Sequence, residues 1–75
     1  MASKWTELRG LRAALKRNSL RHIDVATALG IHRETVTRWV NLDLTPGADS
    51  LMRLVEFLRR HEPTLEAADL FKGAR

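Results

Sequence analysis

The chain has 75 residues and a mass of 8.5 kDa, so it forms at most one small domain. Cysteine is absent, 44% of the residues are hydrophobic and 29% are charged, which excludes a disulfide framework, a thiolate zinc site and a disordered tail. No run approaches the roughly 18 apolar residues of a membrane span, no secretory leader is expected, and so small a chain hardly encloses a deep active-site pocket. The composition therefore favours a binding module over an enzyme or a membrane protein.

The net charge of +4 comes from the N-terminal end of the chain. Residues 1–17 carry a single acidic residue, Glu7. The basic residues of the same stretch are Lys4, Arg9, Arg12, Lys16 and Arg17. Basic and acidic residues balance in the remainder, with three of each in 18–44 and five of each in 45–75. The basic run is either a solvated helix face or a contact with a polyanion, and charge alone does not separate the two interpretations.

Hydrophobic periodicity predicts five short helices and no strand, which is an all-α fold of one domain over residues 1–75. The predicted segments are 5–17, 21–29, 33–41, 48–60 and 65–71. In the first of these, Leu8, Leu11 and Leu15 share a buried face with Ala14, and the turn-forming pair at 18–19 ends the helix.

The second segment turns Val25, Ala26 and Leu29 inward and ends at Gly30, which is suited to a left-handed helix terminus. The third segment buries Val36, Trp39 and Val40, and residues 41–45 form a loop. The sequence Thr45-Pro46-Gly47 opens the fourth helix, because proline is tolerated in a first turn and threonine or glycine can cap it. The inward positions of that helix are Leu51, Leu54, Val55 and Leu58, flanked by Met52 or Phe57. A Thr64 cap then begins the fifth helix.

Residues 21–41 have the outline of a helix-turn-helix, since two short helices are joined by a three-residue turn that contains glycine. The apolar residues hold the helices at a steep angle, which leaves one face of the second helix unused by the core. That face carries His32, Arg33, Glu34, Thr37, Arg38 and Asn41. A helix fits the DNA major groove, where arginine binds guanine bidentately and glutamate accepts a hydrogen bond from cytosine N4. The sequence therefore predicts a face that reads base edges.

At residues 11–58 the chain resembles the Xre/Cro/CI type of helix-turn-helix, the lambda-repressor-like DNA-binding domains. The resemblance rests on the run from Leu11 to Leu20, on Val25-Ala26-Thr27-Ala28-Leu29-Gly30-Ile31, on the helix from Arg33 to Trp39, and on Pro46 with the fourth helix behind it. It implies that base edges are read by His32, Arg33, Glu34, Thr37 and Arg38. It also implies DNA-backbone contacts by His22, Asn41, Thr45, Ser50 and Arg53.

Three residues depart from the family pattern. Arg21 stands where a serine or threonine cap is usual. The absence of that cap is expected to cost the second helix about 1 kcal/mol of stability, unless Ser19 or a shifted helix boundary compensates. Val40 stands where glutamate is usual. Leu42 replaces the usual glycine, and together with Leu44 it is expected to alter the loop or to contact a second protomer.

Each candidate residue also has a plainer interpretation. His32 can serve only as a helix cap, Glu34 can be favoured by the helix dipole, and Thr37 can be a surface residue or touch a thymine methyl group. Trp39 belongs to the core, not to a base-stacking platform. The histidines lack metal-ligand spacing and no nucleophile or phosphate-loop motif is present, so we expect no cofactor, no metal, no small-molecule ligand and no enzymatic activity.

The resemblance implies a sequence-specific regulator of double-stranded DNA, a small repressor or autorepressor that binds an inverted repeat as a homodimer. Its recognition helices are expected about 34 Å apart. Candidate dimer contacts are Leu42, Leu44, Leu65, Leu70 and Phe71. Such chains resemble phage Cro-like repressors, restriction–modification controllers and anti-CRISPR-associated autorepressors, which act in the cytoplasm of a bacterial or phage-infected cell, at the nucleoid. The alternative is an antitoxin or other protein-interaction module, whose working surface is formed by Leu42, Leu44 and Phe71.

Overall fold

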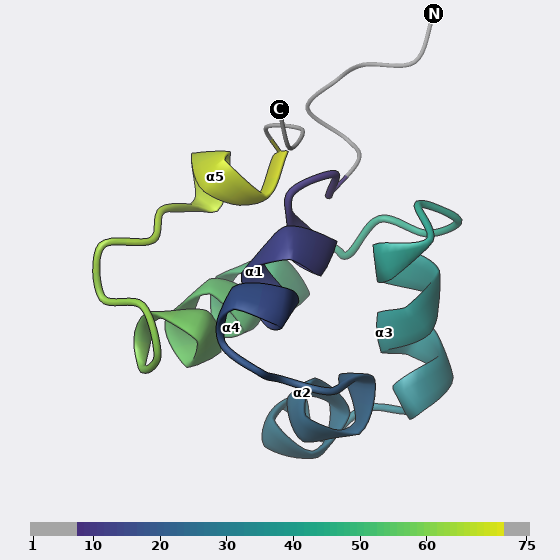
Figure 1. Ribbon diagram of the computed structural model, residues 1–75. Helices are drawn as coiled ribbons and strands as arrows, with labels where there is room; N and C mark the ends of the chain where they lie inside the picture. Colours follow the sequence, from purple (N-terminus) through teal and green to yellow (C-terminus); the bar gives the residue numbers. More distant parts are fainter. Residues whose placement is uncertain (1–7, 72–75) are drawn as a thin grey trace, which may run out of the picture.

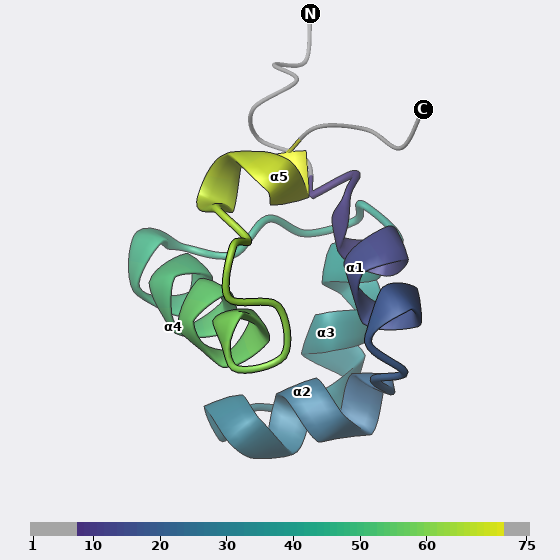
Figure 2. The ribbon, with the colours of Figure 1, turned by 60° about the vertical axis from the view of Figure 1, so that its left-hand side comes forward.

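The computed structural model describes residues 8–71, and five helices follow one another along this part of the chain (Figure 1). The helices are α1 (Leu11–Arg17), α2 (His22–Leu29), α3 (Arg33–Val40), α4 (Ala48–Arg59) and α5 (Ala67–Phe71). No strand occurs among the described residues, so the predicted all-α, five-helix fold is confirmed. α2 packs against α3 and α4, while α5 packs against α1 and α4 and lies above both in Figure 2.

The core draws side chains from all five helices and from the segments that flank α1 and α5. Its members are Leu8, Leu11, Ala14, Leu15, Val25, Ala26, Leu29, Val36, Trp39, Val40, Leu54, Val55, Leu58, Leu65 and Leu70. The expected inward positions of the first four helices are therefore buried, except that Leu51 is only partly covered. Phe57 flanks the α4 stripe, whereas Met52 is 64% exposed.

The first helix begins later than predicted. Arg9 and Gly10 form a turn, and the α-helix starts at Leu11. The backbone N–H of Gly10 donates to the carbonyl oxygen of Leu70 at 2.8 Å, so this group links the turn to α5 instead of joining a helix. Residues 5–7 of the predicted helix lie outside the described part of the chain.

The fifth helix also begins later than predicted, and Thr64 is not its cap. The backbone N–H of Glu66 donates to Oδ2 of Asp69 at 2.8 Å, which satisfies a donor that the helix cannot pair. Leu65 precedes the helix, and its carbonyl oxygen accepts a hydrogen bond from Nε of Arg59 at 2.8 Å. In α4, Gly47 is the N-cap, so Pro46 lies before the helix and not in its first turn.

Three helices end in the same left-handed turn. Ser19, Gly30 and Leu42 have φ values of 54°, 70° and 65° after α1, α2 and α3. At each end the next backbone N–H donates to a carbonyl oxygen five residues earlier, over 2.8–3.0 Å, as in a Schellman motif. Leu42 thus adopts the backbone conformation that glycine favours, and its side chain is half-buried. The hydrophobic residue at this position leaves the turn itself intact.

Candidate nucleic-acid interface

The turn between α2 and α3 gives the two helices their relative placement. The left-handed Gly30 ends α2, and His32 with ψ of 143° begins the change of direction into α3. Val25 of α2 and Val36 of α3 are both fully buried in the core, and Ile31 packs against the same core. In Figure 1, α3 stands at one edge of the molecule, so only one of its faces is covered by the other helices.

The uncovered face of α3 holds most of the predicted base-reading residues. His32, Arg33, Glu34 and Arg38 are exposed, whereas Val36, Trp39 and Val40 on the other face are buried. Within the described residues 8–71, the four exposed side chains make no hydrogen bond and no ion pair. Their donors and acceptors are therefore available to a ligand. His32 is the N-cap residue of α3, but its side chain makes no capping hydrogen bond.

Thr37 differs from the other residues of this face, because its side chain is half-buried and hydrogen-bonded. Its Oγ1 lies 2.8 Å from Nδ1 of His22, the first residue of α2. The sequence predicts base reading for Thr37 and a DNA-backbone contact for His22, without a link between the two. Nothing in the local sequence signals the pair, since the partners are 15 positions apart on different helices.

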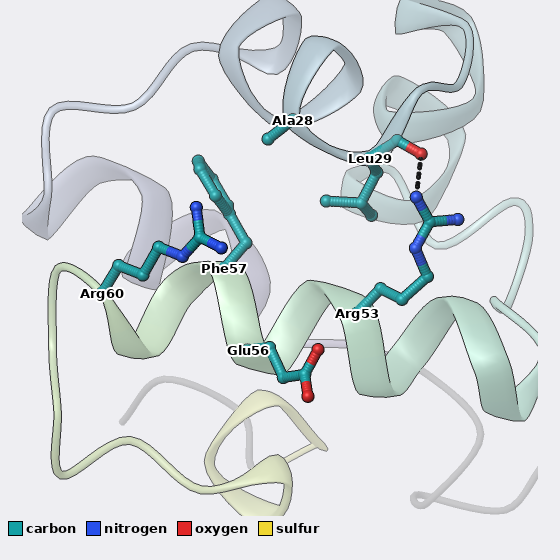
Figure 3. A pocket seen from close by; sticks show the side chains of 6 residues that line it. All are labelled: Ala28, Leu29, Arg53, Glu56, Phe57 and Arg60. Atoms are coloured by element: carbon teal, nitrogen blue, oxygen red, sulfur yellow. Dashed lines mark hydrogen bonds between the residues drawn. The ribbon is translucent and has the colours of Figure 1, made fainter.

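The residues expected at the DNA backbone fall into two groups. Asn41 and Thr45 are exposed and Ser50 is half-buried, all in or near the segment that joins α3 to α4. Asn41 Oδ1 accepts a hydrogen bond from Nη2 of Arg12 at 3.2 Å, which connects α1 to the end of α3. Arg53 is used differently, since its Nη2 donates to the carbonyl oxygen of Leu29 at 2.6 Å (Figure 3). Arg53 thereby caps the C-terminal end of α2.

Figure 3 shows the shallow cleft of about 150 Å³ that lies between α2 and α4 beside this contact. Its walls are Ala28, Leu29, Arg53, Glu56, Phe57 and Arg60. The cleft is open, and one of its two arginines is already bonded to Leu29. It does not form the enclosed, mostly apolar pocket that a small-molecule site needs.

The N-terminus of α2 is capped in a way that was not foreseen. The backbone N–H of Arg21 donates to Oδ2 of Asp24 at 2.8 Å, and the Arg21 guanidinium donates to both oxygens of the same carboxylate. These hydrogen bonds, first that of the side chain and then that of the backbone, lower the pKa of Asp24 below its ordinary value. The same contact raises the pKa of Arg21. Asp24 therefore makes the reverse half of a capping box, from the third helical position back to the backbone N–H of Arg21.

Two arginines of the basic run near the N-terminus form hydrogen bonds with other side chains of the domain. Nε and Nη2 of Arg17 donate to the two carboxylate oxygens of Glu62 at 3.2 and 3.1 Å, and Nδ2 of Asn18 donates to the same carboxylate at 3.0 Å. Arg12 bonds to Asn41, as described above. Lys16 is exposed, whereas Lys4 lies outside the described residues. These arginines are therefore fold contacts as well as positive charges.

The hydrophobic candidates for a dimer contact are also divided. Leu65 and Leu70 are only 1% and 0% exposed, because they close the core beneath α5. Their assignment to a protomer interface is therefore corrected. Leu44 is 44% exposed, and Leu42 and Phe71 are half-buried.

Between residues 8 and 71, no group of three or more acidic, histidine or cysteine side chains is arranged to hold a metal ion. No helix in that part of the chain has both the length and the apolar character that crossing a membrane requires.

Two helices joined by a left-handed turn, with the second helix exposing a polar face, define a helix-turn-helix protein. The family model described as Helix-turn-helix matches residues 11–65, which is more than half of the chain. The chain belongs to this family, of the Xre or lambda-repressor-like type, and is in general terms a DNA-binding transcription regulator. Neither the curated proteins nor the solved structures give a match.

Proposed function

We propose that this protein is a repressor that binds a specific site on double-stranded DNA through the exposed face of α3. The observation that carries the proposal is that Arg33, Glu34 and Arg38 are exposed and unpaired within residues 8–71. The buried residues of the same helix hold it against the core. A helix presented in this way enters the major groove with little rearrangement.

The three side chains supply complementary hydrogen-bonding groups. The guanidinium groups of Arg33 and Arg38 donate to O6 and N7 of guanine, and Glu34 accepts from N4 of cytosine. His32, at the start of the helix, offers one further donor or acceptor. We assign base reading to these residues and to Thr37.

Contacts to the DNA backbone come from residues around this face. His22 lies at the N-terminus of α2, Asn41 and Thr45 lie in the segment after α3, and Ser50 lies in the first turn of α4. Arg53 is left out of this set because its guanidinium caps α2. Contacts of this kind position a protein on the duplex but carry no sequence information.

We further propose that two copies bind an inverted repeat, with their α3 helices about 34 Å apart in successive major grooves. One short helix reads only a few base pairs, so a second copy supplies affinity and specificity. Leu44, with Leu42 and Phe71, is the remaining candidate contact between protomers. Occupation of a promoter by the dimer excludes polymerase, and a promoter of the protein's own gene gives autorepression at the nucleoid.

Selection of duplexes from a random DNA library tests the proposal directly. A two-fold symmetric enriched sequence is expected, and binding to it should weaken steeply as salt rises, because bound arginines release condensed counterions. Retention that is weak, independent of sequence and insensitive to salt would instead favour a protein-interaction module that uses exposed Leu44. Sedimentation of the complex on the enriched duplex gives the number of copies bound.

A further inference from the structure

The hydrogen bond between His22 and Thr37 links a residue predicted to contact the DNA backbone with one predicted to read a base. In the described residues 8–71 it is the only side-chain hydrogen bond between α2 and α3, with Nδ1 of His22 and Oγ1 of Thr37 2.8 Å apart. Both side chains are half-buried, so neither leaves the contact without losing packing. Thr37 is also the only predicted base-reading residue whose side chain has a partner in this part of the chain.

The chemistry of the two groups limits what Thr37 can offer to a base. A threonine hydroxyl has one proton to donate and two lone pairs, and a neutral imidazole has one N–H and one bare nitrogen. If Nδ1 is bare, Thr37 gives its only proton to His22 and can only accept from a base. The partner is then the amino group of adenine or cytosine.

The opposite arrangement reverses the preference. If Nδ1 carries the proton, His22 donates to Thr37 and the hydroxyl proton is free to reach N7, O6 or O4 of a base. Which base suits Thr37 therefore depends on an atom of residue 22. The dependence holds even though residue 22 does not itself touch that base.

We infer that His22 is a specificity-determining residue, which sets the hydrogen-bonding direction of the Thr37 hydroxyl and so the base pair that Thr37 prefers. The inference rests on the proposed DNA-reading function of α3. His22 acts here as a positioning residue through Thr37, in addition to any contact of its other ring nitrogen with phosphate. Nδ1 of His22 contacts Thr37, and Nε2 is the nitrogen that remains for a phosphate. Two conservative substitutions distinguish the role of one nitrogen from that of the other.

His22→Asn keeps a polar atom where Nδ1 lies and loses the one at Nε2, while His22→Gln does the reverse. Each variant, together with Thr37→Val, is put through the random-duplex selection beside the unaltered protein. His22→Gln should lose about 2- to 10-fold of its discrimination at one base pair, the effect of one neutral hydrogen bond. Thr37→Val should lose discrimination at the same base pair, and adding it to His22→Gln should cause no further loss. His22→Asn should retain the discrimination.

A uniform loss of affinity over all sequences in His22→Gln, or changes at different base pairs in His22→Gln and Thr37→Val, would overturn the inference. If the unaltered protein enriches no sequence, the proposed function fails, and the inference fails with it. Imidazole ¹⁵N shifts of the free protein provide a readout without DNA. The His22 shifts should change in Thr37→Val, and an unchanged spectrum counts against the contact.

Discussion

Arg53 and Leu29 are joined across two helices, with Nη2 of the arginine 2.6 Å from the carbonyl oxygen of the leucine. The carbonyl belongs to the last turn of α2, where no intrahelical N–H is available. A charged donor from α4 therefore closes the end of α2 (Figure 3), next to the turn that positions α3. The arrangement makes α4 a support for the end of α2 from which the turn into α3 begins.

Replacing Arg53 by alanine should therefore act on stability more than on DNA contact. We expect the free energy of unfolding to fall by about 1 kcal/mol, because a charged hydrogen bond to a helix terminus is lost at a partly exposed site. Urea denaturation measures the change. Arg60→Ala is the matched control, since the Arg60 guanidinium lines the same cleft but has no hydrogen-bond partner in residues 8–71. Equal stability of the two variants would contradict the capping role.

Arg38→Ala should have the opposite pattern, with little effect on folding and a large effect on DNA. The exposed guanidinium makes no hydrogen bond and no ion pair within residues 8–71. We therefore expect a loss of about 1–3 kcal/mol in binding to the selected duplex and relaxed preference at one base pair. Titration of labelled duplex at fixed salt measures it. Arg60→Ala also removes one positive charge, but at a position outside α3. A comparable loss of DNA affinity in that variant would mean that Arg38 acts only through the net charge of the protein.

The left-handed helix ends make a stability prediction that needs no DNA. Ser19 is exposed with φ of 54°, so Ser19→Gly removes backbone strain without removing buried surface and should stabilise the protein by about 1 kcal/mol. Gly30→Ala is the reverse experiment. A methyl group at Gly30 has no atom within 4 Å, so the expected loss of about 1 kcal/mol reflects backbone strain alone. Thermal unfolding measures both changes in stability. Shifts of the unfolding temperature in the same direction for the two variants would show that the φ value does not control the stability at these positions.

The Arg21–Asp24 cap predicts an acid sensitivity. Because the pKa of Asp24 is lowered in the folded protein from an ordinary value of 3.8, the unfolded chain binds its proton more tightly. The stabilisation is present above pH 3.8 and is lost as the pH falls through the lower pKa of the folded state.

Unfolding free energy measured against pH should thus decline less steeply below pH 4 in Asp24→Asn than in the unaltered protein. Asp43→Asn removes a carboxylate that has no hydrogen-bond partner in residues 8–71 and is the matched control. Parallel curves for all three proteins would exclude a contribution from the cap.

Trp39 is 2% exposed, and in the described part of the chain its indole Nε1 is buried without a hydrogen-bond partner. Trp39→Phe removes this unpaired donor along with some apolar contact, and the two effects oppose each other, so the net change should stay within about 1 kcal/mol. Trp39→Ala should cost about 3–5 kcal/mol, because it leaves a cavity. Chemical denaturation distinguishes the two, and a Phe variant as damaged as the Ala variant would mean that the indole N–H is bonded in solution.

The helices and most of the core were predictable because helical periodicity is a local property. The spacing of Leu11 and Leu15, or of Leu54 and Leu58, marks a buried face wherever the partner helix lies. The exposed face of α3 follows from the same rule, since Val36, Trp39 and Val40 take the buried side. The turn at Gly30 was predictable from the sequence because a positive φ carries little steric cost for glycine.

Contacts between distant residues decided the rest. Gly10 bonds to Leu70 and sets the start of α1, and α5 covers Leu65 and Leu70, which the sequence analysis had assigned to an interface. At the candidate site, the pairs Arg12–Asn41, His22–Thr37 and Arg53–Leu29 join residues 29, 15 and 24 positions apart. No periodic pattern links such positions, because their distance depends on how whole helices pack. The polar face was therefore visible in the sequence, whereas the partners of Thr37 and Asn41 and the cap on α2 exist only in the folded chain.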